Sequence, residues 1–595
     1  MVLAGPGSGK TFVIVQRIRT LIEQYQIPPS EILTITFTRQ AAIEMRQRFL
    51  KITEHRFPEA VFGTFHSVFY QILTRSHPEK QLTLIDEREK SKIAGMILKD
   101  LIPKDRSMVL SGDLVSQVLF ALSRLKGNGG SAEEIAASLQ EPELFPAFCR
   151  EYERMLKELN RLDFDDIITE CGRLFREEPE VLAQWRQRFR YFLIDEYQDI
   201  NAGQFAVMKL LAAPANHLFV VGDDDQSIYG FRGSSPAYML DFDKHYPGAE
   251  RILLSINYRC RQAVIDAASR VIGENKQRFP KEIRAGRPEP GEVSLRTYTD
   301  KAGEQDAILS EIRARQGDTT MAVIVRTNAH VAALAERLAS EGIPFDAPGF
   351  ETKRHNPYRE SEVQDILAYL RASGKKPERP DLYRILNRPL RYLSREALRQ
   401  DPVRLEEMTA YYRDRPGMRK EAEKLIRNLK MIGGMRPALA IRYLRTQMGY
   451  DRHVRESGEY RDPEAALKNL EHLMEEAKAY ERTEAFLHHI EEETERRDAR
   501  KEDRKKADHG AGVRILTMHS SKGLEFDTVW IPEINEGTLP SKKIHTPEAV
   551  EEERRLFYVA MTRARSTLIL SCLLGDSNYA YVPSRFLRGL DPGRS

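Results

Sequence analysis

The first stretch of the chain that could do chemistry is rich in glycine. It follows a short apolar strand at Met1 to Leu3 and precedes a helical pattern of apolar residues. Backbone N–H groups, a lysine and a helix start all suit phosphate oxygens, so the stretch predicts a loop that binds the phosphates of a nucleoside triphosphate. The predicted loop residues are Ala4, Gly5, Pro6, Gly7, Ser8, Gly9, Lys10 and Thr11.

Individual residues of this loop have distinct predicted roles. Lys10 is expected to reach the β- and γ-phosphates, and Thr11 to hold Mg²⁺ through its hydroxyl. Ala4 stands where the general motif has glycine, at a less demanding position than Gly9. The helix that follows is expected to place its apolar residues on one face: Phe12, Val15, Ile18, Leu21 and Ile22.

Two acidic residues end an apolar strand that runs from Phe192 to Ile194. At the carboxyl end of a parallel strand beside a phosphate loop, such a pair predicts a site for a metal ion and a water molecule. Asp195 is predicted to hold Mg²⁺, and Glu196 to orient and deprotonate the attacking water. Simple capping of the strand end is the alternative interpretation of this pair.

A second polar turn follows the apolar strand that ends at Gly222. Gln226 could contact the γ-phosphate through its amide. Tyr229 and Phe231 could stack on unpaired bases, because every base has a π-face. Arg232 closes this turn and is assigned to the same nucleic-acid surface. The alternative is that both aromatic rings belong to a hydrophobic core.

Arginines and a third turn complete the candidate residues. Arg259 and Arg563 each follow an apolar element and predict arginine fingers, because a planar guanidinium stabilises spread phosphoryl charge; either one alone could instead be a surface ion pair. Glu525 could contact a ribose or couple two sites. Residues suited to the phosphate oxygens of a nucleic-acid backbone follow the strand that ends at Thr517: His519, Ser521 and Lys522.

The composition of the chain limits these predictions. Its 595 residues are too many for one core and predict roughly three to five domains. With 92 Lys and Arg against 89 Asp and Glu, the net charge is close to balance, so a nucleic-acid surface must be a local groove. The cysteines form no close pair and are predicted to be small core residues: Cys149, Cys171, Cys260 and Cys572.

The sequence also bears on location. It contains no run of about eighteen apolar residues, which predicts that no segment spans a membrane. It opens inside the phosphate loop, which leaves no room for a secretory signal. We therefore expect a soluble, cytoplasmic protein without a membrane partner.

The order of strand and helix patterns predicts an α/β protein with two α/β domains, each interrupted by a mainly helical insert. The first domain is expected to hold the phosphate loop and the acidic pair, and the second the two arginines. The first domain is predicted at 1–74 and 161–256, its insert at 75–160, the second domain at 257–355 and 510–595, and its insert at 356–509.

In their order and residue sequence, these motifs resemble those of the UvrD/Rep/PcrA family of superfamily-1 DNA helicases. The matching pieces also include residues 36–42, 63–67 and 162–166, and the resemblance covers nearly the whole chain. It implies two RecA-like motor domains with ATP in the cleft between them, single-stranded DNA across their top and 3′-to-5′ movement. It further implies that Tyr258 packs against the adenine and that several residues lie along the DNA: Phe37, Thr38, His66, Tyr229 and Phe231.

Two departures from the family pattern lead to separate expectations. Family members usually begin further upstream, with a glutamine-bearing segment that reads adenine, so GTP is expected to be hydrolysed nearly as well as ATP. They also usually carry Trp where this sequence has Phe231, which predicts weaker stacking on bases.

The combined prediction is a helicase or translocase that uses ATP and Mg²⁺ on single-stranded DNA, in repair, recombination or replication restart. Expected partners are single strands, junctions of single- and double-stranded DNA, and repair or replication proteins. The chain itself is expected to be a monomer or a weak dimer. Two alternatives stay open: a DNA-stimulated ATPase that clears or scaffolds without productive unwinding, and an inactive remnant.

Overall fold

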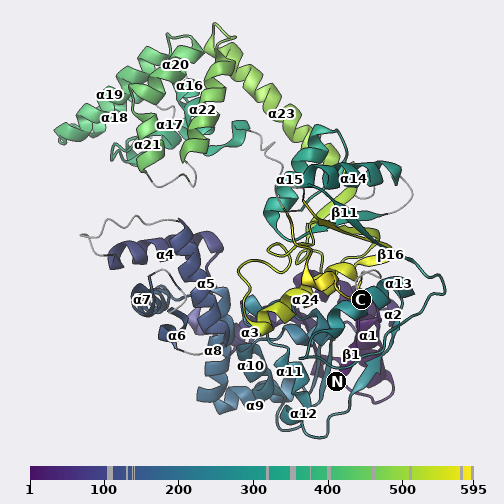
Figure 1. Ribbon diagram of the computed structural model, residues 1–595. Helices are drawn as coiled ribbons and strands as arrows, with labels where there is room; N and C mark the ends of the chain where they lie inside the picture. Colours follow the sequence, from purple (N-terminus) through teal and green to yellow (C-terminus); the bar gives the residue numbers. More distant parts are fainter. Residues whose placement is uncertain are drawn as a thin grey trace. The chain divides into compact units, whose positions relative to one another are not determined.

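The chain forms two compact units in the computed structural model (Figure 1). The first unit comprises Met1–Pro348 and Gly512–Ser595, and the second comprises Gly349–Ala511. The structure describes residues 1–102, 112–128, 131–136, 139, 141–315, 320–348, 357–374, 377–398, 404–457, 460, 463–507, 512–575 and 580–590.

The N-terminal half of the first unit is built on a six-stranded parallel sheet in the order β3-β2-β6-β7-β1-β8. Its inner strands are nearly continuous apolar runs, as expected where helices cover both faces of a parallel sheet. The strands are β1 (Val2–Ala4), β2 (Ile32–Thr36), β3 (Val61–Thr64), β6 (Tyr191–Ile194), β7 (Leu218–Gly222) and β8 (Ile252–Leu254).

Helices cover the two faces of this sheet because alternate strand residues point to opposite sides. Leu193 contributes to a core under α1 and α2, whereas Phe192 and Ile194 contribute to a core under α3, α8, α9 and α10. The helices are α1 (Lys10–Glu23), α2 (Arg39–Ile52), α3 (Phe65–Ser76), α8 (Phe164–Glu177), α9 (Pro179–Arg188), α10 (Ala202–Ala212), α11 (Ala237–Leu240) and α12 (Phe242–His245).

One residue of the predicted apolar face of α1 lies elsewhere. Phe12 is 63% exposed, and Ile14 is buried in its place, together with the other four predicted residues. The expectation for Phe12 was therefore wrong: the buried face of α1 starts at Ile14, and Phe12 in the first turn faces solvent. All four cysteines are buried, as predicted.

A helical segment with its own core separates α3 from α8. Two short strands, β4 (Thr83–Leu84) and β5 (Arg161–Leu162), pair in parallel and bring its ends together. Buried charges then hold α5 against the start of α8: the Lys126 ammonium contacts Asp163 at 3.0 Å and Asp166 at 2.6 Å. The helices are α4 (Glu87–Leu101), α5 (Gly112–Asn128), α6 (Ala132–Ala136) and α7 (Leu144–Glu158).

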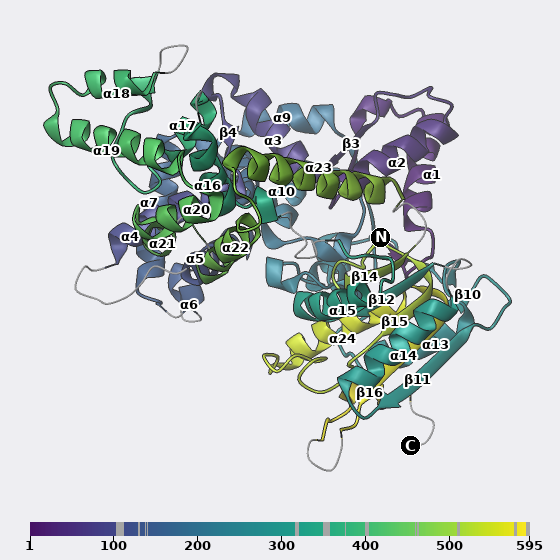
Figure 2. The same cartoon turned by 90° about the horizontal axis from the view of Figure 1, so that it is seen from above.

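The C-terminal half of the first unit carries a second six-stranded parallel sheet in the order β11-β16-β15-β12-β14-β13. Figure 2 shows α13 and α14 lying along its strands. The strands are β11 (Glu292–Tyr298), β12 (Met321–Val325), β13 (Phe345–Asp346), β14 (Val513–Thr517), β15 (Phe526–Ile531) and β16 (Ala564–Leu573). The helices are α13 (Gln262–Gly273), α14 (Lys301–Ala314), α15 (Asn328–Ser340) and α24 (Pro547–Met561).

The second unit follows β13 and precedes β14 in the chain, and it is helical in the residues described. A buried carboxylate organises its core: Asp365 pairs with Arg384 and Arg388 and accepts a hydrogen bond from Tyr450. The helices are α16 (Ser361–Ala372), α17 (Arg379–Ile385), α18 (Leu405–Tyr411), α19 (Pro416–Ile432), α20 (Pro437–Thr446), α21 (Tyr450–Glu456), α22 (Pro463–Ala477) and α23 (Thr483–Ala507).

The predicted fold class is confirmed: two parallel α/β sheets of the RecA-like kind, each interrupted by a mainly helical insert. The predicted boundaries at 355 and at 509–510 lie outside the described residues. In the part of the chain that the structure describes, no helix has both the length and the apolar character that crossing a bilayer would need.

Candidate nucleotide and nucleic-acid site

The glycine-rich loop joins β1 to α1 in the conformation that phosphate binding requires. Gly7 and Gly9 have φ angles of 65° and 88°, in the left-handed region that suits glycine. A side chain at Gly7 would also collide with Arg259, whose Cβ lies 2.5 Å from the position of the added carbon. Gly9 caps α1 without a side-chain hydrogen bond, so the first N–H groups of the helix point toward the loop.

The remaining loop residues fix this shape. Ala4, Gly5, Pro6 and Ser8 are buried, and the Ser8 hydroxyl donates to the Gly5 carbonyl at 2.7 Å. The Lys10 ammonium donates to the carbonyls of Ala4 at 3.0 Å and Gly5 at 3.5 Å. These two carbonyls thus hold the lysine at the loop, and Thr11 follows it in the first turn of α1.

The two acids after β6 lie close to Lys10 but differ in protonation. Burial, followed by the neighbouring Glu196 charge, raises the pKa of Asp195 to about 7. Burial also opposes ionisation of Glu196, but the ammonium groups of Lys10 and Lys522 and the Gln198 amide hold its pKa below the ordinary value. Glu196 is therefore ionised at neutral pH and can accept a proton, whereas at Asp195 burial and the Glu196 charge outweigh the effect of Lys10 and Lys522.

The backbone and side chain of Glu196 are both constrained. Its φ of 51° is unusual for a residue with a side chain, and its Oε2 accepts a hydrogen bond from the Gln198 amide at 2.5 Å. Its N–H donates to Asp195 Oδ1 at 3.0 Å. Strained backbone that is held by neighbours is typical of functional positions.

The third turn contributes a lysine that was predicted to meet a DNA backbone, and the structure places it elsewhere. The Lys522 side chain is 11% exposed, and its ammonium contacts Asp199 Oδ2 at 2.5 Å and the Gln226 carbonyl at 3.0 Å. The same ammonium lies 5.0 Å from the centre of the Tyr229 ring. Lys522 therefore links the acidic strand end to the aromatic loop.

Two further predicted residues are also turned inward. Ser521 is fully buried, and its hydroxyl donates to the Met518 carbonyl at 2.7 Å, so it is not available to a DNA phosphate in this conformation. The Gln226 amide donates to Asp223 Oδ2 at 2.6 Å rather than pointing into open space. In this structure Ser521 and Lys522 are turned inward because the turn packs against the first half of the unit, and their contact with DNA stays a prediction.

The two predicted arginine fingers sit at different depths. The Arg259 side chain, 14% exposed, donates from Nε to Glu525 at 2.6 Å. Arg563 is 1% exposed and donates to the carbonyls of Val559 at 2.8 Å and Leu524 at 3.2 Å. Burial, and then the Arg259 charge, lowers the pKa of Arg563 to about 9.

Tyr258 and Glu525 complete the nucleotide side. The Tyr258 N–H donates to the Gly7 carbonyl at 2.9 Å, which fixes the ring beside the loop, and the ring is 56% exposed. Burial opposes ionisation of Glu525, but Arg565 and Arg259 hold its pKa down at about 2. In the structure Glu525 therefore orients Arg259.

Aromatic side chains form two groups near the ends of the strands. In one, Phe37 packs edge-on against Phe65 at 5.3 Å, and His66 lies 5.7 Å from Phe164. Thr38 is exposed and caps α2, accepting a hydrogen bond from the Ala41 N–H at 3.1 Å. Burial lowers the pKa of His66, so this imidazole is neutral at neutral pH.

The second group joins loops from both halves of the unit. Phe231 is 40% exposed and lies 6.0 Å from Tyr229 and 5.5 Å from His519, measured between ring centres. Tyr229 is half-buried against the core of the second sheet, so the core interpretation holds for part of that ring. The side chain of Arg232 lies outside the described part of the chain.

Sequence reasoning missed several residues of the site. Asn257 is buried and its Oδ1 accepts hydrogen bonds from the N–H groups of Arg259 and Cys260, both at 2.8 Å. Phe164 is 51% exposed beside His66, and its position between acidic residues in 162–166 was an available signal. Lys281 binds the acidic turn at 223–225, and its distance in sequence gave no signal.

The residues present fit a hydrated divalent cation shared with a nucleotide. In the described ranges, no three His, Cys, Asp or Glu side chains are grouped so as to hold a metal by themselves. Burial and the Glu196 charge raise the pKa of Asp195, and a bound cation would favour its ionised form. Together with the Thr11 hydroxyl it offers the oxygen ligands that Mg²⁺ takes alongside phosphates and water.

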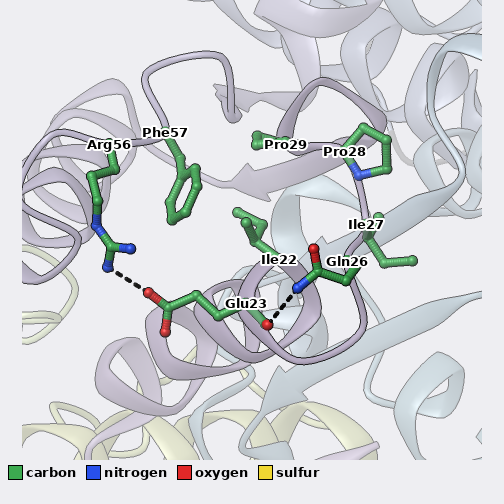
Figure 3. Close-up of a pocket in the computed structure, with 8 residues that line it drawn as sticks. All are labelled: Ile22, Glu23, Gln26, Ile27, Pro28, Pro29, Arg56 and Phe57. Atoms are coloured by element: carbon green, nitrogen blue, oxygen red, sulfur yellow. Dashed lines mark hydrogen bonds and ion pairs between the residues drawn. The ribbon is translucent and has the colours of Figure 1, made fainter.

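A hollow at the far end of α1 is unrelated to this site (Figure 3). Its polar feature is the ion pair between Glu23 and Arg56 at 2.6 Å, with Phe57 beside the arginine. Glu23 ends the helix that Lys10 begins, so roughly 20 Å of helix separates the hollow from the phosphate loop.

The sheets and the phosphate loop define the class of P-loop proteins with RecA-like sheets. Comparison with known families gives two matches: the UvrD/REP helicase N-terminal domain over residues 1–247 and the UvrD-like helicase C-terminal domain over residues 252–575. The chain belongs to the UvrD/REP helicase family.

Similar proteins cover nearly the whole chain. It is 33% identical to the protein of Bacillus subtilis named as a putative ATP-dependent DNA helicase, YjcD. This alignment of 613 residues covers 99% of this chain and 78% of the relative. It is 30% identical over 634 residues to the ATP-dependent DNA helicase PcrA of Leuconostoc citreum, over 100% of this chain and 83% of the relative. The PcrA of Staphylococcus epidermidis is 30% identical over 628 residues, with 99% and 84% covered.

Proposed function

We propose that this protein is an ATP-dependent DNA helicase or translocase that moves 3′-to-5′ along single-stranded DNA. One observation carries the proposal: the Lys522 ammonium contacts Asp199 and the Gln226 carbonyl while lying 5.0 Å from the Tyr229 ring. A charge change at the phosphates can thus reach a ring suited to stack on a base. The family and the names of the PcrA relatives support the same activity.

The proposed nucleotide chemistry assigns one task to each side chain. Lys10 binds the β- and γ-phosphates after leaving the carbonyls of Ala4 and Gly5. Thr11 and Asp195 would hold Mg²⁺, which when bound would neutralise charge on the phosphates. Glu196 orients the attacking water and accepts its proton, because it is the acid that stays ionised.

The arginines and the glutamine complete this proposed site. Arg259 stabilises the γ-phosphoryl charge and is oriented by Glu525 at 2.6 Å. Arg563 would do so only after exchanging its carbonyl partners, so its engagement would follow closure of the site. Gln226 would likewise leave Asp223 to contact the γ-phosphate, and Tyr258 would stack on the base.

The proposed DNA surface consists of the two aromatic groups. Phe37, His66 and Phe164 lie beside the first sheet, and Tyr229 and Phe231 lie in the loop after β7. Thr38, His519 and Arg232 are proposed to contact the sugar–phosphate backbone at their edges. The exposed rings of Phe164 and Phe231 favour single strands over duplex, because stacking needs unpaired bases.

The proposed domain organisation places the nucleotide chemistry and the arginines in two motor domains, each with an insert. The first motor domain comprises 1–74 and 161–256, with an insert at 75–160; the second comprises 257–355 and 510–595, with an insert at 356–509. We propose action in repair, recombination or replication restart in the cytoplasm, on single strands and junctions, as a monomer or weak dimer that meets repair or replication proteins.

A strand-displacement assay tests polarity and unwinding together. A duplex with a 3′ single-stranded tail should be unwound with ATP and Mg²⁺, whereas a duplex with a 5′ tail should not. Unwinding of the 5′-tailed duplex alone would contradict the polarity. The Glu196→Gln protein is the control, because it should bind DNA and nucleotide without displacing the strand. ATP hydrolysis that DNA stimulates without strand displacement would favour the alternative, a translocase or scaffold.

A further inference from the structure

Three consecutive acids in the first half of α24 each hold a different segment of the first unit. Glu551 accepts hydrogen bonds from the N–H groups of Lys276 at 2.8 Å and Gln277 at 3.3 Å. Glu553 forms a two-pronged ion pair with Arg326 at the end of β12. The middle acid, Glu552, contacts the loop that carries Tyr229 and Phe231.

Glu552 binds the backbone of the aromatic loop. Its Oε1 accepts a hydrogen bond from the Gly230 N–H at 2.9 Å. The backbone N–H groups of Gly230 and Phe231 both act to lower the pKa of this carboxyl, against the effect of burial. Burial raises the pKa of Glu552, which shows that the carboxylate is largely removed from water. A hydrogen bond from a backbone N–H to a carboxylate is among the stronger ones that proteins make.

The contact also explains the residue type at position 230. A methyl group added to Gly230 would overlap both carboxylate oxygens of Glu552. The φ angle of Gly230 is not in the left-handed region, so the backbone itself does not require glycine there. An alanine there would therefore have to displace the Glu552 carboxylate and disturb its hydrogen bond with the residue 230 N–H.

The segment held in this way carries both stacking rings of the second aromatic group. Tyr229 precedes Gly230 and Phe231 follows it, with their ring centres 6.0 Å apart. At the other end, roughly 14 Å along the helix axis, α24 ends at Met561 just before Arg563. One rigid helix thus joins the backbone of the ring-bearing loop to a guanidinium near Glu196.

We propose that Glu552 is a positioning residue that couples the nucleotide site to the DNA surface by fixing the Tyr229–Phe231 loop to α24. This inference rests on the proposed function, since it assigns a mechanical link between the two sites of that function. When Arg563 shifts toward a nucleotide, α24 moves with it, and the hydrogen bond between Glu552 and the Gly230 N–H carries the rings along. Without Glu552 the rings keep their own stacking partners but lose their link to the helix.

The experiment compares ATP turnover with and without single-stranded DNA. In Glu552→Ala, the ratio of DNA-stimulated to DNA-free turnover should fall roughly tenfold, the scale expected for loss of a charged hydrogen bond. Glu552→Gln keeps one acceptor oxygen of the same shape and should recover part of the ratio. Glu548→Gln is the matched control: it lies one turn earlier on the same helix, is exposed, and should retain the parent ratio.

A double-mutant cycle separates coupling from simple damage to the fold. Gly230→Ala should lower the same ratio in the parent but should have little further effect in the Glu552→Ala protein, because the overlapping carboxylate is gone. Melting temperatures measured in parallel identify any variant that merely unfolds. If Glu552→Ala unfolds, Glu552→Gln and Gly230→Ala still test the link, since neither shortens the side chain at position 552.

The outcomes separate this inference from the function on which it rests. If the parent shows no stimulation by DNA, the proposed function fails. If the parent is stimulated and folded Glu552→Ala keeps the parent ratio, the inference alone is overturned. Additive effects of Glu552→Ala and Gly230→Ala would also overturn it, because independent sites do not share a contact.

Discussion

Two buried acidic clusters follow neighbouring strands of the first sheet, and their lysines are used differently. After β7, the Lys281 ammonium contacts Asp223 at 2.7 Å, Asp224 at 2.5 Å and Asp225 at 2.8 Å. After β6, Lys10 lies near Asp195 and Glu196, yet in the described part of the chain it forms no ion pair and donates to carbonyls of its own loop.

This difference separates a structural cluster from a functional one. Lys281 is saturated by three carboxylates and cannot leave without stranding buried charge. Lys10 is held by two neutral acceptors, which phosphate oxygens can replace at little cost. An ammonium that is paired directly with buried carboxylates, as in Lys281, stabilises the fold. An ammonium that is held only by backbone carbonyls, as in Lys10, is available to a ligand.

The largest expected effect comes from removing the saturated lysine. Lys281→Met should leave three buried carboxylates without their ammonium and cost roughly 3–5 kcal/mol, which corresponds to a melting temperature lower by about 10 °C. Tryptophan fluorescence during heating measures the change. Lys10→Met is the matched control and should cost less than Lys281→Met, because it removes two hydrogen bonds to carbonyls and leaves Lys522 as a cation beside Glu196. Equal losses in the two proteins would erase the distinction.

The second effect concerns the ionised acid beside Lys10. Glu196→Gln should keep nucleotide binding and lower ATP turnover with DNA about a hundredfold or more, because the general base is lost. Nucleotide binding is followed with a fluorescent ATP analogue, and turnover by phosphate release. Hydrolysis at the parent rate would show that Glu196 is no base. Lys10→Met should fail at the binding step instead.

The third effect tests the contact between the acidic residues after β6 and the aromatic loop. Lys522 pairs with Asp199 and lies beside the Tyr229 ring, which neighbours the exposed Phe231 ring. The acids around Lys281 are instead buried within the protein. Phe231→Ala should weaken binding to a single-stranded oligonucleotide by about 1–3 kcal/mol, the scale of one base stacked on a ring. Fluorescence anisotropy at matched salt measures it. An unchanged affinity would remove Phe231 from the DNA surface.

The smallest effect is a pH dependence at Asp195. Its pKa of about 7 lies above the ordinary value, so the neutral form is favoured in the folded protein, and a bound cation must displace a proton as the pH falls below 7. Half-saturation by Mg²⁺ in the presence of ATP, followed by thermal shift, should therefore need about tenfold more Mg²⁺ at pH 6 than at pH 8. Asp195→Asn should abolish this difference, and a pH-independent Mg²⁺ requirement in the parent would contradict the assignment.

The fold was largely predictable because buried parallel strands are continuous apolar runs with sharp ends. β6 ends at Ile194, β7 at Gly222 and β14 at Thr517, which are the ends expected from sequence. The phosphate loop was predictable because its residues are contiguous in sequence. Its glycines allow the positive φ angles, and its lysine lies next to the loop carbonyls. Phe12 shows the limit, since apolar spacing assigns a residue to a helix face but does not show whether that residue is buried.

The connections between loops could not be predicted from residue type. Lys522 suits a DNA phosphate by type, yet the fold brings it to Asp199, more than three hundred positions away. Lys281 and Glu552 are ordinary charged residues until tertiary packing sets them against Asp224 and Gly230. Long-range packing, which no local pattern encodes, decides whether such a charge faces solvent, an acid or a backbone N–H.

The most direct test of the central claim is the rate of ATP hydrolysis by the parent protein with and without single-stranded DNA. The contacts from the acids through Lys522 to the Tyr229 ring predict that single strands raise the rate at least tenfold and that duplex of equal length raises it much less. A rate that is the same with single strands, with duplex and without DNA would contradict the account.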